Sequence, residues 1–296
     1  MRIVANGIAI EIDDQGLPSG EPLLLIMGLG MQIIGWPDEL VQLLVARGFR
    51  VIRMDNRDIG LSQHFDHLGV PSLPWAALRY ALHLPVRASY GLVDMASDAL
   101  GVLDALGLPQ AHVCGASMGG MVAQHLAARH PDRVKSLTLM MTTSGARHLP
   151  QPALSVHRVL MSRPDGDGND VEAVVKYLVR LLGIIGSPGF APEPAYLEQR
   201  LRAMVLRSWH PAGTARQLVA VAADGDRTHM LARISAPTHV IHGKQDVLVR
   251  VAAGHDLSRK IAGSTQDMIA GMGHDLPLLL LPRFAEGITA NAKRAG

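Results

Sequence analysis

Short apolar runs alternate with segments of helical periodicity through the first half of the chain. Residues 22–27, 50–54 and 111–114 are predicted to be strands, because each is a short β-rich run next to turn residues. The segment 92–106 has apolar residues at helical spacing instead. Strands that alternate with helices are typical of a parallel sheet covered by helices. The pattern therefore predicts an α/β fold with a mainly parallel central sheet flanked by helices.

Two further strands are predicted at the start of the chain. Residues 2–5 and 8–12 are joined by Asn6-Gly7, a pair that is common in tight hairpin turns. Pro37, followed by two acidic residues, indicates the start of a helix. Residues 134–141 are predicted to be another strand.

The character of the chain changes after about residue 142. Strand patterns are missing from 142–234, where helical segments at 171–185 and 194–207 lie between loops rich in glycine and proline. Strand patterns return at 238–242 and again at 265–269. The segment between is therefore predicted to be an insertion into the sheet domain.

This organisation predicts two units. Residues 1–141 and 235–296 are expected to form the core domain, which closes with a helix from about Pro277. Residues 142–234 are expected to form a helical cap. Deletion of this cap is expected to alter the choice of substrate.

Composition and charge exclude several classes of protein. The chain has 296 residues, of which 48% are hydrophobic and 18% charged, so there is ample material for a buried sheet. Its apolar runs are much shorter than the roughly 20 residues of a membrane span, so no membrane-spanning helix is expected. The formal net charge is +2 without a run of like charges, so nucleic acid is not an expected partner. A small neutral or weakly charged molecule fits better.

The compartment is inferred from the start of the chain and its cysteine content. Polar residues come before any apolar stretch of signal-peptide length, so no secretory leader is expected. Cys114 is the only cysteine, which excludes an intrachain disulfide and is compatible with a reducing compartment. A cytoplasmic location is therefore expected. The oligomeric state does not follow from these features.

The strongest chemical signal is Gly115-Ala116-Ser117-Met118-Gly119, placed where a predicted strand passes into a predicted helix. A sharp turn at this point needs glycines on both sides of the serine, since larger side chains would clash. The turn would expose the hydroxyl of Ser117 at the end of the strand. An incidental serine in a glycine-rich turn explains this context less well.

A serine hydroxyl becomes a good nucleophile only beside a base that a carboxylate orients. Asp246 follows the predicted strand 238–242 and is the best candidate for the carboxylate. His274 lies in a glycine-rich loop after the last predicted strand and is the candidate base. The chain order Ser, Asp, His is one of those known for such triads. Ser117, Asp246 and His274 are thus predicted to be catalytic.

Acyl transfer also needs donors for the negative oxygen of the tetrahedral intermediate. The backbone N–H groups of Met118 and Leu29 are predicted to form this oxyanion hole, because both lie in glycine-rich turns that follow strands. For the turn at Leu29, the alternative is an ordinary glycine turn. The lone Gly28-Leu29-Gly30 is not a nucleotide-binding fingerprint.

The remaining histidines do not suggest a metal site. His239 and His242 lie three apart on one predicted strand and therefore face opposite sides of the sheet. They are interpreted as surface or core polar residues. His125 and His130 lie near the end of a helix, where a histidine favours the negative end of the dipole. No metal and no cofactor is expected.

The elbow, the Asp246 loop, the His274 loop and the Gly28-Leu29 turn occur in an order that resembles the α/β-hydrolase fold family, in its serine esterase branch. Residues 36–37 and 55–62 look like those of bacterial polyketide methyl esterases such as aclacinomycin methylesterase. The resemblance implies a Ser-His-Asp acyl-enzyme mechanism without a cofactor, acting on a small to medium hydrophobic ester. Many members have His-Gly at the oxyanion loop, where this chain has Met27-Gly28.

Several alternatives remain within this fold. Haloalkane dehalogenases and epoxide hydrolases have an aspartate at the elbow, whereas this chain has Ser117. Cofactor-free haloperoxidases or perhydrolases and enol-lactone hydrolases use the same triad, so the motif does not separate them from carboxylesterases. A receptor that binds a ligand and turns it over slowly is a more remote alternative. Arg57 and Asp58, which could steer a substrate, are interpreted as structural.

Overall fold

The computed structural model describes residues 1–152, 156, 162, 164–165 and 170–296. An eight-stranded sheet in the order β1-β2-β4-β3-β5-β6-β7-β8 forms its centre. β1 and β2 are antiparallel to their neighbours, and the remaining pairs are parallel, which confirms the predicted mainly parallel sheet. The strands are β1 (Arg2–Ala5), β2 (Ile8–Gln15), β3 (Glu21–Ile26), β4 (Phe49–Met54), β5 (Ala111–Ala116), β6 (Val134–Met140), β7 (Thr238–Gly243) and β8 (Thr265–Ile269).

The predicted hairpin joins β1 and β2. Asn6 and Gly7 both have positive φ angles, of 50° and 76°, and Ala5 pairs with Ile8 across the turn. Positive φ at both central residues is the conformation that Asn-Gly sequences favour. The hairpin is therefore confirmed.

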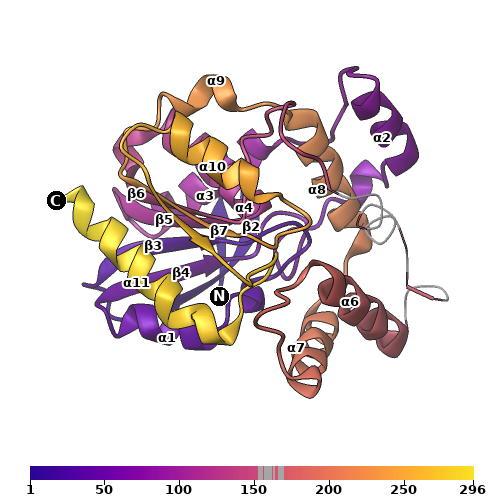
Figure 1. Cartoon of the computed structure of the whole chain (residues 1–296), viewed down its shortest axis with the longest axis horizontal. Helices are drawn as coiled ribbons and strands as arrows, with labels where there is room; N and C mark the ends of the chain where they lie inside the picture. Colours follow the sequence, from indigo (N-terminus) through magenta and orange to yellow (C-terminus); the bar gives the residue numbers. More distant parts are fainter. Residues whose placement is uncertain (153–155, 157–161, 163, 166–169) are drawn as a thin grey trace.

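Helices cover both faces of the sheet (Figure 1). One face packs against α1 (Asp38–Val45) and α11 (Leu281–Ala292), and the other against α3 (Leu92–Ala105), α4 (Met118–Arg129) and α10 (Val251–Lys260). The closing helix predicted from Pro277 starts with a 3₁₀ turn at Leu278–Leu280 before α11. A further helix, α2 (Leu73–Ala81), was not predicted.

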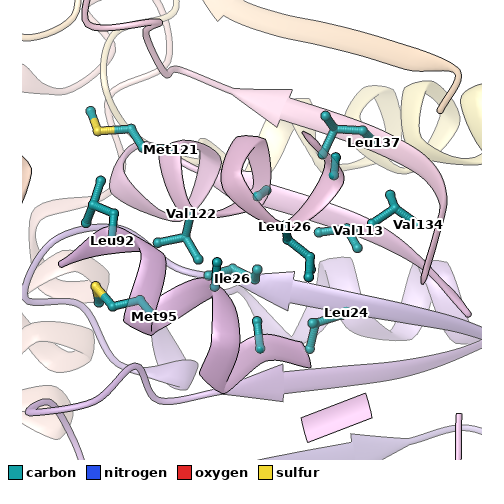
Figure 2. Packing of buried hydrophobic residues seen from close by; sticks show 14 of the residues in the cluster. Leu24, Ile26, Leu92, Met95, Val113, Met121, Val122, Leu126, Val134 and Leu137 are labelled. Atoms are coloured by element: carbon teal, nitrogen blue, oxygen red, sulfur yellow. The ribbon is translucent and has the colours of Figure 1, made fainter. Parts of the chain in front are cut away.

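Buried apolar side chains fill the space between the sheet, α3 and α4 (Figure 2). Leu24, Ile26 and Val113 from β3 and β5 are at most 1% exposed, and Val122 and Leu126 of α4 are fully buried. Removing apolar surface from water is the main force that stabilises such a layer. This packing fixes β5 and α4, and with them the turn between them.

The chain between β6 and β7 contributes four helices among the described residues: α6 (Val171–Ile185), α7 (Pro194–Arg207), α8 (Pro211–Asp224) and α9 (Thr228–Leu231). The bounds of α6 and α7 are those predicted. α6 and α7 share a small apolar cluster of their own, whereas α8 and α9 contribute residues to the main core. The helical insertion is thus present, and its exact boundaries remain a prediction. None of the helices formed by described residues is long and apolar enough to span a bilayer.

Candidate active site

Ser117 lies in the turn between β5 and α4, as the sequence predicts. Its φ and ψ angles are 53° and −120°, a conformation that is rare for residues with a side chain. A Cβ atom on Gly115 would lie 2.3 Å from the carbonyl oxygen of Gly119, and one on Gly119 would lie 2.0 Å from that of Ile26. The two glycines are therefore required by close packing on either side of the serine.

A chain of hydrogen bonds links the three residues predicted to be catalytic. Nε2 of His274 lies 3.0 Å from Oγ of Ser117, and Nδ1 of His274 lies 2.7 Å from Oδ2 of Asp246. Asp246 is 1% exposed and His274 is 9% exposed. Residues that are 157 and 28 positions apart in sequence are thus brought to the same end of the sheet.

The environment of Asp246 keeps its carboxyl group ionised. Burial alone would raise its pKa, but the nearby His274 and hydrogen bonds from His242 and His274 hold the pKa well below its usual range. Its Oδ1 atom also accepts hydrogen bonds from the backbone N–H groups of Leu248 and Val249, at 2.9 and 2.8 Å. An ionised Asp246 must accept from Nδ1–H of His274. The lone pair on Nε2 then faces the hydroxyl of Ser117.

His242 is a neighbour of Asp246 for which the sequence predicted only a surface or core polar role. It is fully buried, and its Nε2 atom lies 2.7 Å from the carbonyl oxygen of Val249 and 3.5 Å from Oδ2 of Asp246. It therefore supports both the loop after β7 and the carboxylate. Its position at the end of a predicted strand, four residues before Asp246, was the available signal.

The two predicted oxyanion donors lie in turns beside Ser117. A Cβ atom on Gly28 would lie 3.1 Å from Cβ of Ser117, so the loop that contains Leu29 approaches the serine closely. Met118 is the first residue of α4, and N–H groups in the first turn of a helix have no partner within it. Within the described residues, the N–H groups of Leu29 and Met118 are not bonded to an acceptor. Both amides are available for a ligand.

Two buried side chains hold the Leu29 loop, and neither was predicted. Gln217 on α8 accepts a hydrogen bond of 2.9 Å from the N–H of Gly30, and Asn56 donates one of 2.8 Å to the carbonyl oxygen of Met27. Both side chains are at most 1% exposed. The sequence carried no signal for Gln217, because the helix that presents it was not predicted.

Arg57 and Asp58 have structural partners, which agrees with their interpretation. The guanidinium of Arg57 binds both carboxylate oxygens of Asp98, at 2.6 and 2.7 Å. Asp58 binds the guanidinium of Arg216 and accepts a hydrogen bond from the hydroxyl of Tyr90. Burial opposes the ionisation of Asp58, but these partners lower its pKa overall. Each residue of the pair thus joins the loop after β4 to a helix.

A group of potential metal ligands, which the sequence did not predict, lies beside this network. Atoms of His64, Asp66 and His210 come within 4.8 Å of one another. The two imidazole rings are stacked, with centroids 3.8 Å apart and planes 5° from parallel, so their in-plane lone pairs do not converge. Asp66 already accepts hydrogen bonds from His210 and from the guanidinium of Arg216. An ion-pair network therefore explains this group better than a metal site.

Two known proteins are similar to this chain over nearly its full length and theirs. Rhodomycin D methylesterase DauP of Streptomyces sp. strain C5 is 30% identical over 99% of this chain and 98% of its own length. Rhodomycin D methylesterase DnrP of Streptomyces peucetius is 29% identical over the same shares. These similarities confirm the predicted resemblance to bacterial polyketide methyl esterases.

A solved structure shows the same fold. The meta-cleavage product hydrolase CumD of Pseudomonas fluorescens IP01 aligns with a TM-score of 0.75 over 100% of this chain and 98% of that chain, at 19% identity. Residues 21–279 also match the family described as the alpha/beta hydrolase fold. The sheet order, the strand–turn–helix at Ser117 and this match agree, and the chain belongs to the alpha/beta hydrolase fold family.

Proposed function

We propose that this protein is a serine hydrolase that cleaves a carboxylic ester through a covalent acyl-enzyme. The observation that carries the proposal is the hydrogen-bonded chain from Ser117 through His274 to Asp246. A nucleophile, a base and a carboxylate in this order are the parts that acyl transfer needs. The two rhodomycin D methylesterases, similar over their full length, favour an ester as the substrate.

In the first step, Oγ of Ser117 forms a bond to the carbonyl carbon of the ester while Nε2 of His274 takes the hydroxyl proton. The electron pair of the carbonyl moves to its oxygen, which the N–H groups of Leu29 and Met118 would stabilise. The intermediate then breaks the bond to the alcohol oxygen, and His274 returns the proton to that oxygen. The ionised Asp246 stabilises the imidazolium that forms between these events.

In the second step, water replaces the alcohol. His274 removes a proton from the water as its oxygen attacks the acyl carbon, and the proton passes to Oγ of Ser117 as the acid leaves. The same residues therefore serve both half-reactions, and the proposed chemistry needs no cofactor. A small to medium hydrophobic ester remains the proposed substrate.

The proposal is tested with a Ser117→Ala variant and a p-nitrophenyl ester. Loss of the nucleophile is expected to lower kcat by several orders of magnitude and to abolish labelling by a fluorophosphonate probe. Ser136→Ala, which removes a buried hydroxyl of β6 that contacts His112, is the matched control and should remain active. Unchanged hydrolysis by Ser117→Ala would refute the proposal.

Pre-steady-state kinetics separates the remaining alternatives. An esterase should release p-nitrophenol through many turnovers. Release that stops at one equivalent per chain would indicate a ligand-binding receptor instead. Perhydrolase and lactonase activities are measured in the same preparation with hydrogen peroxide and with an enol-lactone. The proposal expects kcat/KM for the ester to exceed the values for both.

A further inference from the structure

The loop that carries His274 is joined to the C-terminal end of α6. The N–H of His274 donates a hydrogen bond of 2.7 Å to the carbonyl oxygen of Ile185, the last residue of α6. Gly189 donates one of 2.9 Å to the carbonyl oxygen of Gly271, three residues before His274 in the same loop. The backbone of the proposed base is therefore bound to a helix of the inserted segment.

Ser187 lies at the centre of this junction. It is 4% exposed, and its hydroxyl oxygen accepts a hydrogen bond of 2.8 Å from the N–H of Gly273. The same hydroxyl donates a hydrogen bond to Oδ1 of Asp275. The hydroxyl of Ser187 thus connects the residue before His274 to the residue after it.

The fit between the two segments is tight. A Cβ atom on Gly273 would lie 2.2 Å from the carbonyl oxygen of Gly186, so a larger residue has no room there. Asp275 is half-buried, and burial raises the pKa of its carboxyl group even though Ser187 donates hydrogen bonds to it. Loss of the hydroxyl would leave a buried N–H and a poorly solvated carboxyl group without this partner, which favours a displaced loop.

We infer that Ser187 is a positioning residue that holds His274 at hydrogen-bonding distance from Ser117. The inference rests on the proposed function. Asp246 fixes one ring nitrogen of His274, but it does not fix the backbone from which the ring projects. The hydroxyl of Ser187 binds the backbone N–H of the residue before His274 and the side-chain carboxylate of the residue after it. A displacement of about 1 Å at a reacting group can lower a rate about a hundredfold, so a shift of this loop would reduce proton transfer from Ser117.

The test compares Ser187→Ala with Ser187→Thr, which keeps a hydroxyl, and with Ser136→Ala. For hydrolysis of p-nitrophenyl butyrate, Ser187→Ala is expected to lower kcat at least about tenfold and to change KM by less than about threefold. The rate constant of fluorophosphonate labelling should fall with kcat, because both depend on activation of Ser117. Ser187→Thr should restore most of kcat, and Ser136→Ala should leave it unchanged. Equal kcat values for Ser187→Ala and Ser136→Ala would overturn the inference.

Asp275 provides a second comparison, which decides the matter if Ser187→Ala does not fold. Asp275→Asn and Asp275→Ala both remove the charge near His274, but only asparagine keeps an oxygen that can accept from Ser187. The kcat of Asp275→Ala is expected to be several-fold below that of Asp275→Asn. Equal values would contradict the role of the hydrogen bond.

Failure of the inference and failure of the proposed function give different results. If Ser117→Ala remains active, the proposed function itself fails. If Ser117→Ala is inactive while Ser187→Ala keeps its full kcat, the esterase proposal stands and only the positioning role is lost.

Discussion

Gln217 shows how a single buried side chain can control the proposed oxyanion hole. Its Oε1 atom accepts from the N–H of Gly30, and its Nε2 atom donates a hydrogen bond of 2.9 Å to the carbonyl oxygen of Arg57. Gly30 follows Leu29 directly and has a φ angle of 68°. The amide of Leu29 is therefore oriented by a turn that Gln217 binds from the neighbouring helix.

Replacement of Gln217 by leucine is expected to lower kcat about tenfold to a hundredfold, because a displaced Leu29 amide no longer stabilises the developing oxyanion. KM should change little, since the effect belongs to the transition state. The measurement is steady-state hydrolysis of a p-nitrophenyl ester.

The matched control is Gln124→Leu. Gln124 is also fully buried, and it binds Thr143 and Arg227 through its two side-chain groups. Both variants should lose stability, since each leaves buried backbone or side-chain groups without a partner. An equal fall of kcat in the two variants would show that Gln217 acts only through stability.

Among the elements, α4 and β3 make an unusually close contact. Gly119 of α4 lies so near β3 that a Cβ atom would come within 2.0 Å of the carbonyl oxygen of Ile26. This contact sets the distance between the helix that begins after Ser117 and the strand that precedes the Leu29 loop. The spacing of the proposed nucleophile and the proposed oxyanion donors thus depends on a residue without a side chain.

Gly119→Ala is expected to lower the free energy of unfolding by about 3 kcal/mol or more, because neither backbone segment can move away without repacking the core. Gly183→Ala is the control: Gly183 lies within α6 and is exposed, and a Cβ atom added there would meet nothing within 4 Å. There alanine should stabilise the protein by about 0.5–1 kcal/mol. Urea denaturation measures both, and a neutral Gly119→Ala would contradict the proposed close contact.

The elements that the sequence predicted best are those with strong local patterns. The helix Val171–Ile185 and the strand Thr265–Ile269 have the predicted bounds, because their apolar periodicity and flanking residues specify them locally. Helices α2 and α10 were not predicted. α2 has no buried residue, and the buried residues of α10 are Ala253, Gly254, Asp256 and Leu257, of which only the leucine is a large apolar residue, so neither helix has the apolar face that sequence patterns show.

The sequence predicted only part of the candidate site, for a similar reason. Ser117, Asp246 and His274 follow strands in a recognisable order, so their places could be predicted from local motifs. Ser187, in the loop after α6, and Gln217, on α8, contact the site from segments remote in sequence, 86 residues from Gly273 and 187 from Gly30. Contacts of this kind depend on how the inserted helices pack, which local patterns do not specify.

For the whole molecule, the insertion and the core are closely connected. Ala220 of α8 and Met230 and Leu231 of α9 belong to the same apolar cluster as α3, α4 and the sheet. The insertion also binds the loops of Leu29 and His274 through Gln217 and Ser187. Deletion of residues 142–234 would therefore expose core surface and release both loops. A loss of stability is therefore expected in addition to the altered choice of substrate that the sequence predicts.

Buried and half-buried titratable groups predict how the stability of the whole molecule depends on pH. Burial, assisted by Lys135 and Arg294 respectively, lowers the pKa of His112 and of His239 in the folded protein. The unfolded chain takes up protons on these residues below about pH 6.5, whereas the folded protein does so only at lower pH. Their contribution to stability is therefore complete above about pH 6.5 and is lost as the pH falls.

Aspartates cause a second loss of stability at lower pH. Despite the opposing effect of burial, ion pairs and hydrogen bonds lower the pKa of Asp58 and Asp224, so their contribution is present above about pH 4 and is lost below it. Burial raises the pKa of Asp55 and of Asp275. The folded protein takes up these two protons more readily than the unfolded chain, which partly offsets the loss of stability in acid. The histidine effect is separate, because it occurs at a pH where most carboxyl groups remain ionised.

The urea midpoint is accordingly expected to be lower at pH 5.5 than at pH 7.5. A variant with both His112→Gln and His239→Gln cannot take up these protons, so its midpoints at the two pH values should differ much less. Glutamine retains polar atoms for the hydroxyl partners of the two histidines, Ser136 and Thr265. If the double variant showed the same difference in midpoint as the natural chain, proton uptake by these two histidines would not be its cause, and other groups would have to account for the loss of stability in mild acid.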